Sequence, residues 1–294
     1  MLVKDVLQKT TQFFRDKGFE SPRLDSELLI ATALNWPRMH LYLKFDYPLT
    51  EQEVTACREF VKRRTAGEPV AYILGRKDFY NHSFTVSPAV LIPRPETETL
   101  VEETVKFLRA RDPELIPRVV DFGAGSGCVG LSIAAEVPIA RVLGVDASGD
   151  ALEIAKKNAD ALELSERCSF QLANVANLTK DQIEGALGGP IDAIVANPPY
   201  IAEDDPNVEA NVRRFEPSMA LFSEESGLKH IREWAAKAAE LVRPGGLVMF
   251  EIGHEQGRAA SEVFRSVGRF QDIEIVKDLS SRDRFIRCFR SEEN

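Results

Sequence analysis

The sequence predicts an α/β protein built on a doubly wound, mostly parallel seven-stranded sheet, with a small helical domain ahead of it. From Arg118 onward, short apolar runs alternate with helical stretches, which is typical of parallel strands joined by crossover helices. Residues 1 to about 75 show helical spacing of apolar residues instead. A chain of 294 residues with 44% hydrophobic content can form two such domains.

Helix-ending and helix-starting residues divide the first region. An apolar pattern with helical spacing stops at Gly18, and Pro37 closes a second helix. Thr50 followed by Glu53 forms a capping-box pair, which predicts a third helix that continues to Gly67. Helical packing alone accounts for the apolar residues of this region.

The pattern changes to alternation between Tyr72 and Leu91, which predicts a β-hairpin with its turn near Asn81-His82. We therefore expect a helical domain over residues 1–75, a hairpin linker over 76–93 and an α/β domain over 94–294. In that last domain a helix should run from Pro95 to about Arg109. Further strands are expected at 119–122, 142–146, 170–172, 191–196, 247–252, 272–277 and 285–289, and further helices at 128–135, 150–162, 227–241 and 255–267.

Composition narrows the classes of function. The chain carries 37 Lys and Arg against 46 Asp and Glu, so the basic surface that stable nucleic-acid binding requires is not expected. The four cysteines and four histidines are scattered, which predicts neither a metal site nor a disulfide framework. With no signal peptide pattern and no long apolar run, we expect a soluble cytoplasmic monomer that does not bind a membrane.

The tetrapeptide Asn197-Pro198-Pro199-Tyr200 directly follows the buried strand predicted at 191–196. Two prolines cannot continue a central strand, because neither has an N–H for the ladder. The chain must turn where open α/β sheets place their ligand sites. The Asn197 side chain, the main-chain carbonyls of this stiff loop and the flat Tyr200 ring suit a planar NH2 group. An ordinary strand-to-loop turn is the alternative.

A glycine-rich loop joins the first strand of the sheet to its helix. Alternate glycines allow the backbone to turn sharply and to approach a ligand beside helix N–H groups. Asp146, at the end of the second strand, is placed to accept hydrogen bonds from two ribose hydroxyls. We expect this part of the site to consist of Asp121, Gly123, Ala124, Gly125, Ser126, Gly127 and Asp146.

A dinucleotide site is an alternative, because residues 125–130 also fit the G-x-G-x-x-G pattern. Two features favour S-adenosylmethionine over NAD. Gly123 follows the strand directly, so the loop starts earlier than the dinucleotide pattern requires. Asp121 would repel a pyrophosphate but would attract a cationic amino-acid tail, and S-adenosylmethionine has such a tail and no phosphate. A purely structural glycine turn is the third interpretation.

Several further motifs occur in a fixed order along the chain. They are Arg23-Leu24-Asp25, Glu27-Leu28-Leu29, Gly67-Glu68-Pro69, Tyr72-Ile73, Gly75, residues 90–98, Glu216-Pro217, Ala220-Leu221, Gly227-Leu228, Glu251-Ile252-Gly253 and Gln256. Together with the glycine loop and the tetrapeptide, they make the sequence resemble the release-factor glutamine methyltransferases (the HemK/PrmC family) along nearly its whole length. The glycine loop is shared by many methyltransferases, whereas the segment 90–98 singles out this family.

The resemblance implies a class I methyltransferase fold and transfer of a methyl group from S-adenosylmethionine to the glutamine amide of the Gly-Gly-Gln loop of peptide-chain release factors. The helical domain would then dock the substrate. Asn197 and the Pro198 carbonyl would accept the two amide N–H bonds, with Pro199 and Tyr200 completing the catalytic loop. Asn174 and Val175 would stand beside the adenine, where the family often has Asp-Trp, and Asn197 would also contact the cofactor. Ser281 and Asn81 each replace a usual glycine.

Two other functions remain open at this stage. An adenine amino-methyltransferase acting on DNA or RNA would use the same tetrapeptide, because the exocyclic amine of adenine is also planar. A catalytically silent nucleotide-binding module could use the helical domain only to recruit a partner. The acidic composition disfavours the first function and the intact tetrapeptide disfavours the second.

Overall fold

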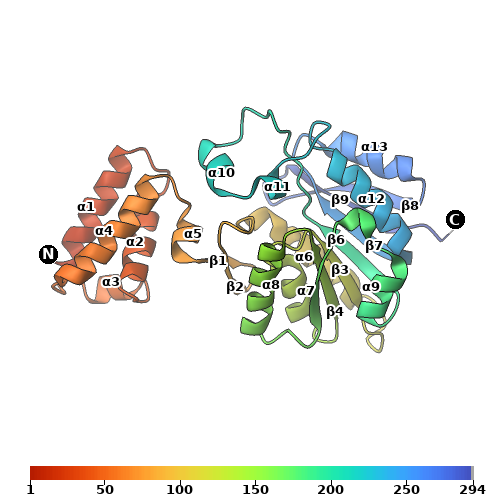
Figure 1. Cartoon of the computed structure of the whole chain (residues 1–294), viewed down its shortest axis with the longest axis horizontal. Helices are drawn as coiled ribbons and strands as arrows, with labels where there is room; N and C mark the ends of the chain where they lie inside the picture. The colour runs from red at the N-terminus through yellow and green to blue at the C-terminus, as the bar shows by residue number, and fades with distance from the viewer. Residues whose placement is uncertain (293–294) are drawn as a thin grey trace. The chain divides into compact units, whose positions relative to one another are not determined.

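The computed structural model describes residues 1–292 and divides the chain into two compact units (Figure 1). The helical unit contains residues 1–76 together with 210–215, and the sheet unit contains 77–209 and the chain from Glu216 onward. Each unit has hydrophobic clusters of its own. Within residues 1–292, no helix combines the length and apolar character that crossing a membrane requires.

The helical unit is formed mainly by three long helices. The predicted capping box is present, because Glu53 N–H donates to Thr50 Oγ1 at 3.2 Å and Thr50 N–H donates to the Glu53 carboxylate at 2.8 Å. The alternation predicted from Tyr72 to Leu91 does not begin at Tyr72, because Tyr72 lies in a short helix that ends at Gly75. The helices are α1 (Val3–Asp16), α2 (Pro22–Ala33), α3 (His40–Leu43), α4 (Glu51–Thr65), α5 (Val70–Leu74) and α10 (Ala210–Phe215).

The predicted hairpin is present but shorter than the alternation suggested. It consists of β1 (Arg76–Phe79) and β2 (His82–Thr85), with residues 80–81 at its turn. Residues 86–92 continue as turns and loop rather than as strand. The buried rings of Phe79 and Phe84 join the hydrophobic core of the sheet unit, so the hairpin packs on that unit.

The predicted seven-stranded, mostly parallel sheet is confirmed, with strand order β5-β4-β3-β6-β7-β9-β8. The first five strands in this order are parallel, and β9 is antiparallel to both of its neighbours. Ser281, between β8 and β9, has a φ of 61°, in the left-handed region that favours glycine. The strands are β3 (Arg118–Phe122), β4 (Arg141–Asp146), β5 (Cys168–Leu172), β6 (Ile191–Ala196), β7 (Val242–Glu251), β8 (Phe270–Lys277) and β9 (Asp283–Arg290).

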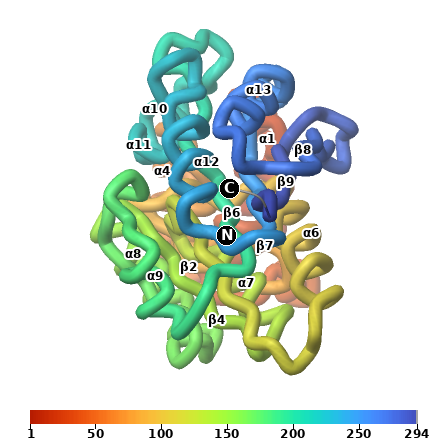
Figure 2. Tube along the Cα trace, turned by 90° about the vertical axis from the view of Figure 1, so that its right-hand side faces the viewer, coloured from red at the N-terminus to blue at the C-terminus, as the bar shows by residue number. Residues whose placement is uncertain are grey.

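Helices cover both faces of the sheet, because successive strand residues point to opposite faces. Val119 belongs to the cluster with α6 (Glu98–Arg109), α7 (Cys128–Glu136) and α8 (Gly149–Ala161). Its neighbour Val120 belongs to the cluster with α9 (Lys180–Leu187), α12 (Lys229–Leu241) and α13 (Gly257–Val267). Figure 2 shows α6 and α12 on opposite sides of β6 and β7. The short elements are η1 (Pro95–Thr97), η2 (Val175–Asn177) and α11 (Ser218–Leu221).

Strand order reverses at β3, which lies between β4 and β6. The chain first adds strands on one side of β3 and then returns to add β6 on the other side. In open α/β sheets, such a switch point leaves a crevice beyond the carboxyl ends of the two strands, where ligands bind. The glycine loop leaves β3 and the tetrapeptide leaves β6, so both begin at this crevice.

Candidate active site

The glycine loop and the tetrapeptide lie side by side. Phe122 pairs with Ala196 at the last register position of β3 and β6, and each loop starts one residue later. Gly123 has a φ of 70°, and a Cβ built on it would lie 2.9 Å from the Trp234 ring and 3.9 Å from the Asn197 carbonyl oxygen. Only glycine fits here without displacing the tryptophan, so the packing of Trp234 against the start of the glycine loop depends on this residue.

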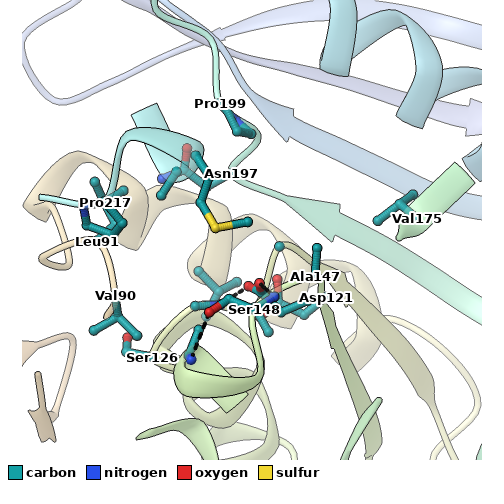
Figure 3. A pocket seen from close by; sticks show the side chains of 18 of the residues that line it. Val90, Leu91, Asp121, Ser126, Ala147, Ser148, Val175, Asn197, Pro199 and Pro217 are labelled. Atoms are coloured by element: carbon teal, nitrogen blue, oxygen red, sulfur yellow. Dashed lines mark hydrogen bonds between the residues drawn. The ribbon is translucent and has the colours of Figure 1, made fainter. Parts of the chain in front are cut away.

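The two loops open onto one cavity (Figure 3). Its floor comes from the ends of β3 and β4, where Asp121, Ala147 and Ser148 lie close together in the view. Asn197 and Pro199 come from the end of β6. The predicted residues that line the cavity are Asp121, Gly123, Ala124, Gly125, Ser126, Asp146, Asn174, Val175, Asn197 and Pro199.

The three other predicted residues lie outside the lining. Gly127 caps the start of α7 with a φ of 78°, and Pro198 is buried. The Tyr200 hydroxyl turns away to donate a hydrogen bond to Glu251 Oε1 at 3.0 Å. Burial raises the pKa of Tyr200, and the neighbouring Glu251 carboxylate raises it further, so this hydroxyl keeps its proton. None of these three residues is among those that line the cavity.

Asp146 is held rigidly at the end of β4. Its Oδ2 accepts the Gly125 N–H and its Oδ1 accepts the Ser148 N–H, both at 2.9 Å. A carboxylate has about four lone-pair positions, so each oxygen can accept one more hydrogen bond from a ligand. Two adjacent hydroxyl groups, as on a ribose, match this acceptor pair.

Asp121 is a buried carboxyl group on the cavity wall, and the Gly130 N–H donates to its Oδ2 at 3.0 Å. Burial raises the pKa of Asp121 to about 7; the Gly130 hydrogen bond acts against this shift and the charge of Asp146 adds to it. A cationic ligand group would favour the ionised form, whereas a phosphate would oppose it. The electrostatics therefore fit a cationic tail and not a pyrophosphate.

The cavity wall that contains Val90, Leu91 and Pro217 is not among the site residues that the sequence predicts, although the segment 90–98 is one of its motifs. Val90, Leu91 and Pro217 lie together on this side (Figure 3). Buried Glu216 anchors the wall by accepting the Ile92 N–H at 3.1 Å and an Arg94 Nη2–H at 2.6 Å. The other unpredicted lining residues are Ala89, Pro93, Arg94, Thr97, Cys128, Val129, Ala147, Ser148, Ala151, Ala173, Met219, Ala220, His230, Glu233 and Trp234.

His230 and Trp234 bring α12 to the cavity, and no sequence motif marked them. His230 Nδ1 lies 2.8 Å from the Ser223 hydroxyl, and burial lowers the pKa of His230. Trp234 packs edge-on against Phe122 with ring centroids 6.0 Å apart. The two side chains are a neutral imidazole and an apolar ring, and neither supplies charge to the site.

Comparison with known proteins identifies both units. Residues 5–75 match the family model described as PrmC N-terminal domain, and residues 101–250 match the one described as Methyltransferase small domain. A release factor glutamine methyltransferase of Chlorobaculum tepidum is 39% identical over 97% of this chain and 96% of its own length. One of Moorella thermoacetica is 36% identical over all of both chains. The catalytic domain of hMettl16, solved with an RNA hairpin, shares the fold at 13% identity, with a TM-score of 0.55 over 83% of this chain and 82% of that one.

The fold and the site together define a class I methyltransferase, of the type that uses S-adenosylmethionine. Within that class, the chain belongs to the release factor glutamine methyltransferase family. The resemblance inferred from the motifs is confirmed, and the relatives give no support to an adenine methyltransferase or a silent binding module.

We predict that Asp121→Asn stabilises the protein at alkaline pH. The folded protein holds the Asp121 proton up to about pH 7, whereas an unfolded Asp releases it near pH 4. Wild-type stability should therefore fall, relative to the variant, as pH rises from about 4 to 7, and the variant should be more stable by a few kcal/mol above pH 7. Urea denaturation at pH 5 and pH 8 measures this difference.

The matched control is Asp204→Asn, which changes an exposed carboxyl group in the same unit. Its free energy of unfolding should differ from that of wild type by the same amount at both pH values. A difference between Asp121→Asn and wild type that does not change with pH would contradict the prediction.

Proposed function

We propose that this protein transfers a methyl group from S-adenosylmethionine to the side-chain amide nitrogen of the glutamine in the Gly-Gly-Gln loop of peptide-chain release factors. The observation that carries the proposal is that the Asn197 corner and the glycine loop share one cavity. The names of the full-length relatives support the choice of substrate. A release factor acts in translation, so the reaction belongs in the cytoplasm.

The residues present fit this cofactor. Asp146 would hold the ribose hydroxyls, the loop 123–127 would lie against the amino-acid tail, and Asp121 would balance its cationic group. Val175, buried at the cavity wall, and Asn174 beside it would border the adenine without stacking on it. When bound, S-adenosylmethionine supplies a methyl group that its sulfonium has already activated, so the protein's task is positioning.

The tetrapeptide would position and polarise the substrate amide. An amide nitrogen is a poor nucleophile, because its lone pair is delocalised into the carbonyl. The Asn197 side-chain oxygen and the Pro198 carbonyl would accept its two N–H bonds and draw electron density onto the nitrogen. Pro199 stiffens the loop, and Tyr200, anchored by Glu251, would flank the amide plane. Holding two reactants in line can lower a barrier by up to about 7–11 kcal/mol.

We further propose that residues 1–75 form the docking domain, that 76–93 link it to the catalytic domain over 94–294, and that one copy of the chain suffices. A groove between α1 and α4 offers a docking surface within the helical unit. It is lined by Met1, Val6, Lys9, Thr10, Phe13, Val54, Cys57, Arg58, Val61, Lys62, Thr65 and Ala66. Its charged members are all cationic, so it suits an acidic segment with an apolar side.

We predict that the purified protein transfers labelled methyl groups from S-adenosylmethionine to an intact release factor. A release factor whose Gly-Gly-Gln glutamine is replaced by alanine should accept none, because the acceptor amide is missing. Scintillation counting after gel separation measures the transfer. Equal labelling of both substrates would place the methyl group elsewhere, and labelling of DNA or RNA alone would favour the adenine reaction.

Asn197→Ala should lower kcat by at least about 10²–10³-fold, because it removes one aligned polar contact to the reacting group. The dissociation constant for S-adenosylmethionine should stay close to that of wild type, since Asn197 is expected to act on the substrate amide. Stopped assays and calorimetric titration measure the two quantities. If kcat fell and the dissociation constant rose by similar factors, Asn197 would have a structural role.

Reversing the charge of the groove should weaken binding of the release factor without changing the methyl-transfer step. In the triple variant Lys9→Glu, Arg58→Glu and Lys62→Glu, we expect KM for the intact release factor to rise about tenfold or more. KM for a short Gly-Gly-Gln peptide should not change, because such a peptide lacks the acidic segment that the groove would bind. A matched variant reverses three exposed lysines of the sheet unit, Lys156, Lys157 and Lys277. Equal effects of the two variants would rule out this docking surface.

A further inference from the structure

A buried carboxylate lies behind the tetrapeptide. Glu251, at the end of β7, is 1% exposed. It accepts two hydroxyl hydrogen bonds, from Thr97 Oγ1 to Oε2 at 2.6 Å and from Tyr200 to Oε1 at 3.0 Å. Burial raises the pKa of Glu251, while these two hydroxyls and the charge of Arg284 act in the opposite direction. Each oxygen of the Glu251 carboxyl group thus accepts one hydrogen bond, Oε2 from Thr97 and Oε1 from Tyr200.

This arrangement fixes the direction of the Thr97 hydroxyl. Thr97 Oγ1 is the donor in its hydrogen bond to Glu251 Oε2, so the single hydroxyl proton of Thr97 is committed to Glu251. The Thr97 oxygen then has only lone pairs left for other neighbours. Asn197 is such a neighbour, because its Nδ2 lies 3.4 Å from Thr97 Oγ1.

The lone pairs of Thr97 select one of the two orientations of the Asn197 amide. With the NH2 group toward Thr97, a donor faces an acceptor. With the amide flipped, Asn197 Oδ1 would face the Thr97 lone pairs and the two would repel. The contact is longer than the usual 2.9–3.0 Å, so the hydrogen bond itself is weak. Its effect is to make one orientation of the Asn197 amide more favourable than the other. The selected orientation turns Oδ1 away from Thr97.

We propose that Thr97 is a positioning residue that, held by Glu251, keeps the Asn197 amide oriented with its oxygen available to accept the N–H of the substrate glutamine. The inference rests on the proposed role of Asn197 in binding the substrate amide. It adds the two residues, Thr97 and Glu251, that orient the Asn197 side chain. Three separate elements are involved, since Thr97 comes from η1, Asn197 follows β6 and Glu251 ends β7. The relay therefore ties substrate recognition to the alignment of two adjacent strands and a helix start.

Thr97→Val tests the relay, because valine keeps the shape and removes the hydroxyl. We expect kcat with release factor to fall about tenfold or more, with little change in the dissociation constant for S-adenosylmethionine. Thr97→Ser keeps the hydroxyl and should restore kcat to within about twofold of wild type. Unchanged kcat in Thr97→Val, or equal losses in the valine and serine variants, would overturn the proposal.

A second measurement needs neither substrate nor turnover. In ¹⁵N-edited spectra, Asn197→Ala identifies the Asn197 side-chain signals. The two Asn197 side-chain N–H signals should have the same chemical shifts in wild type and in Thr97→Ser, and the N–H toward residue 97 should shift in Thr97→Val, where its acceptor is missing. Unchanged signals in Thr97→Val would mean that Thr97 does not contact the Asn197 amide, and would overturn the relay. If the signals respond as expected but no release factor is methylated, the relay stands and the proposed function fails.

Discussion

The parallel pairing of β3 and β6 is the contact on which the rest of the structure depends. The strands that carry the glycine loop and the tetrapeptide are separated by more than seventy residues, and their last paired residues are Phe122 and Ala196. This register places the two loops at the same height above the sheet. A shift by one residue would turn the buried side chains of either strand to the opposite face, where different helices pack. The two clusters that enclose the sheet therefore also hold the site together.

Buried carboxyl groups connect the separate segments around the cavity. Asp121, Glu216 and Glu251 are 3%, 5% and 1% exposed, and each accepts hydrogen bonds from another part of the chain. Burying a polar group is unfavourable unless hydrogen bonds compensate it, and each of these groups finds its partners only in the assembled fold. These hydrogen bonds hold the cavity walls in place without a ligand. The burial of the three carboxyl groups lowers the free energy of unfolding in return.

The sequence was sufficient to predict the sheet and the two loops, after β3 and β6, that open onto the cavity. Buried parallel strands are short apolar runs, and glycines and prolines mark their ends, so β3, β4 and β6 and the loops after β3 and β6 were all found. Helix α9 was missed, because its eight residues give too short a pattern. The wall formed by Leu91 and Pro217 was missed for a different reason. Its two segments meet only through Glu216, more than 120 residues from Ile92, and no local pattern reports such a contact.

Helix α10 belongs to the helical unit although it is far from that unit in sequence. Arg214 donates to the Ala66 carbonyl at 3.1 Å, and Asn211 lies so close to Gly67 that a side chain there would collide with it. The chain consequently passes between the two units three times rather than once. If the chain were cut after residue 76, the helical unit would lose α10, which would remain on the other fragment. The helical unit is thus not a detachable module, and grafting it onto another enzyme would require the segment 210–215 as well.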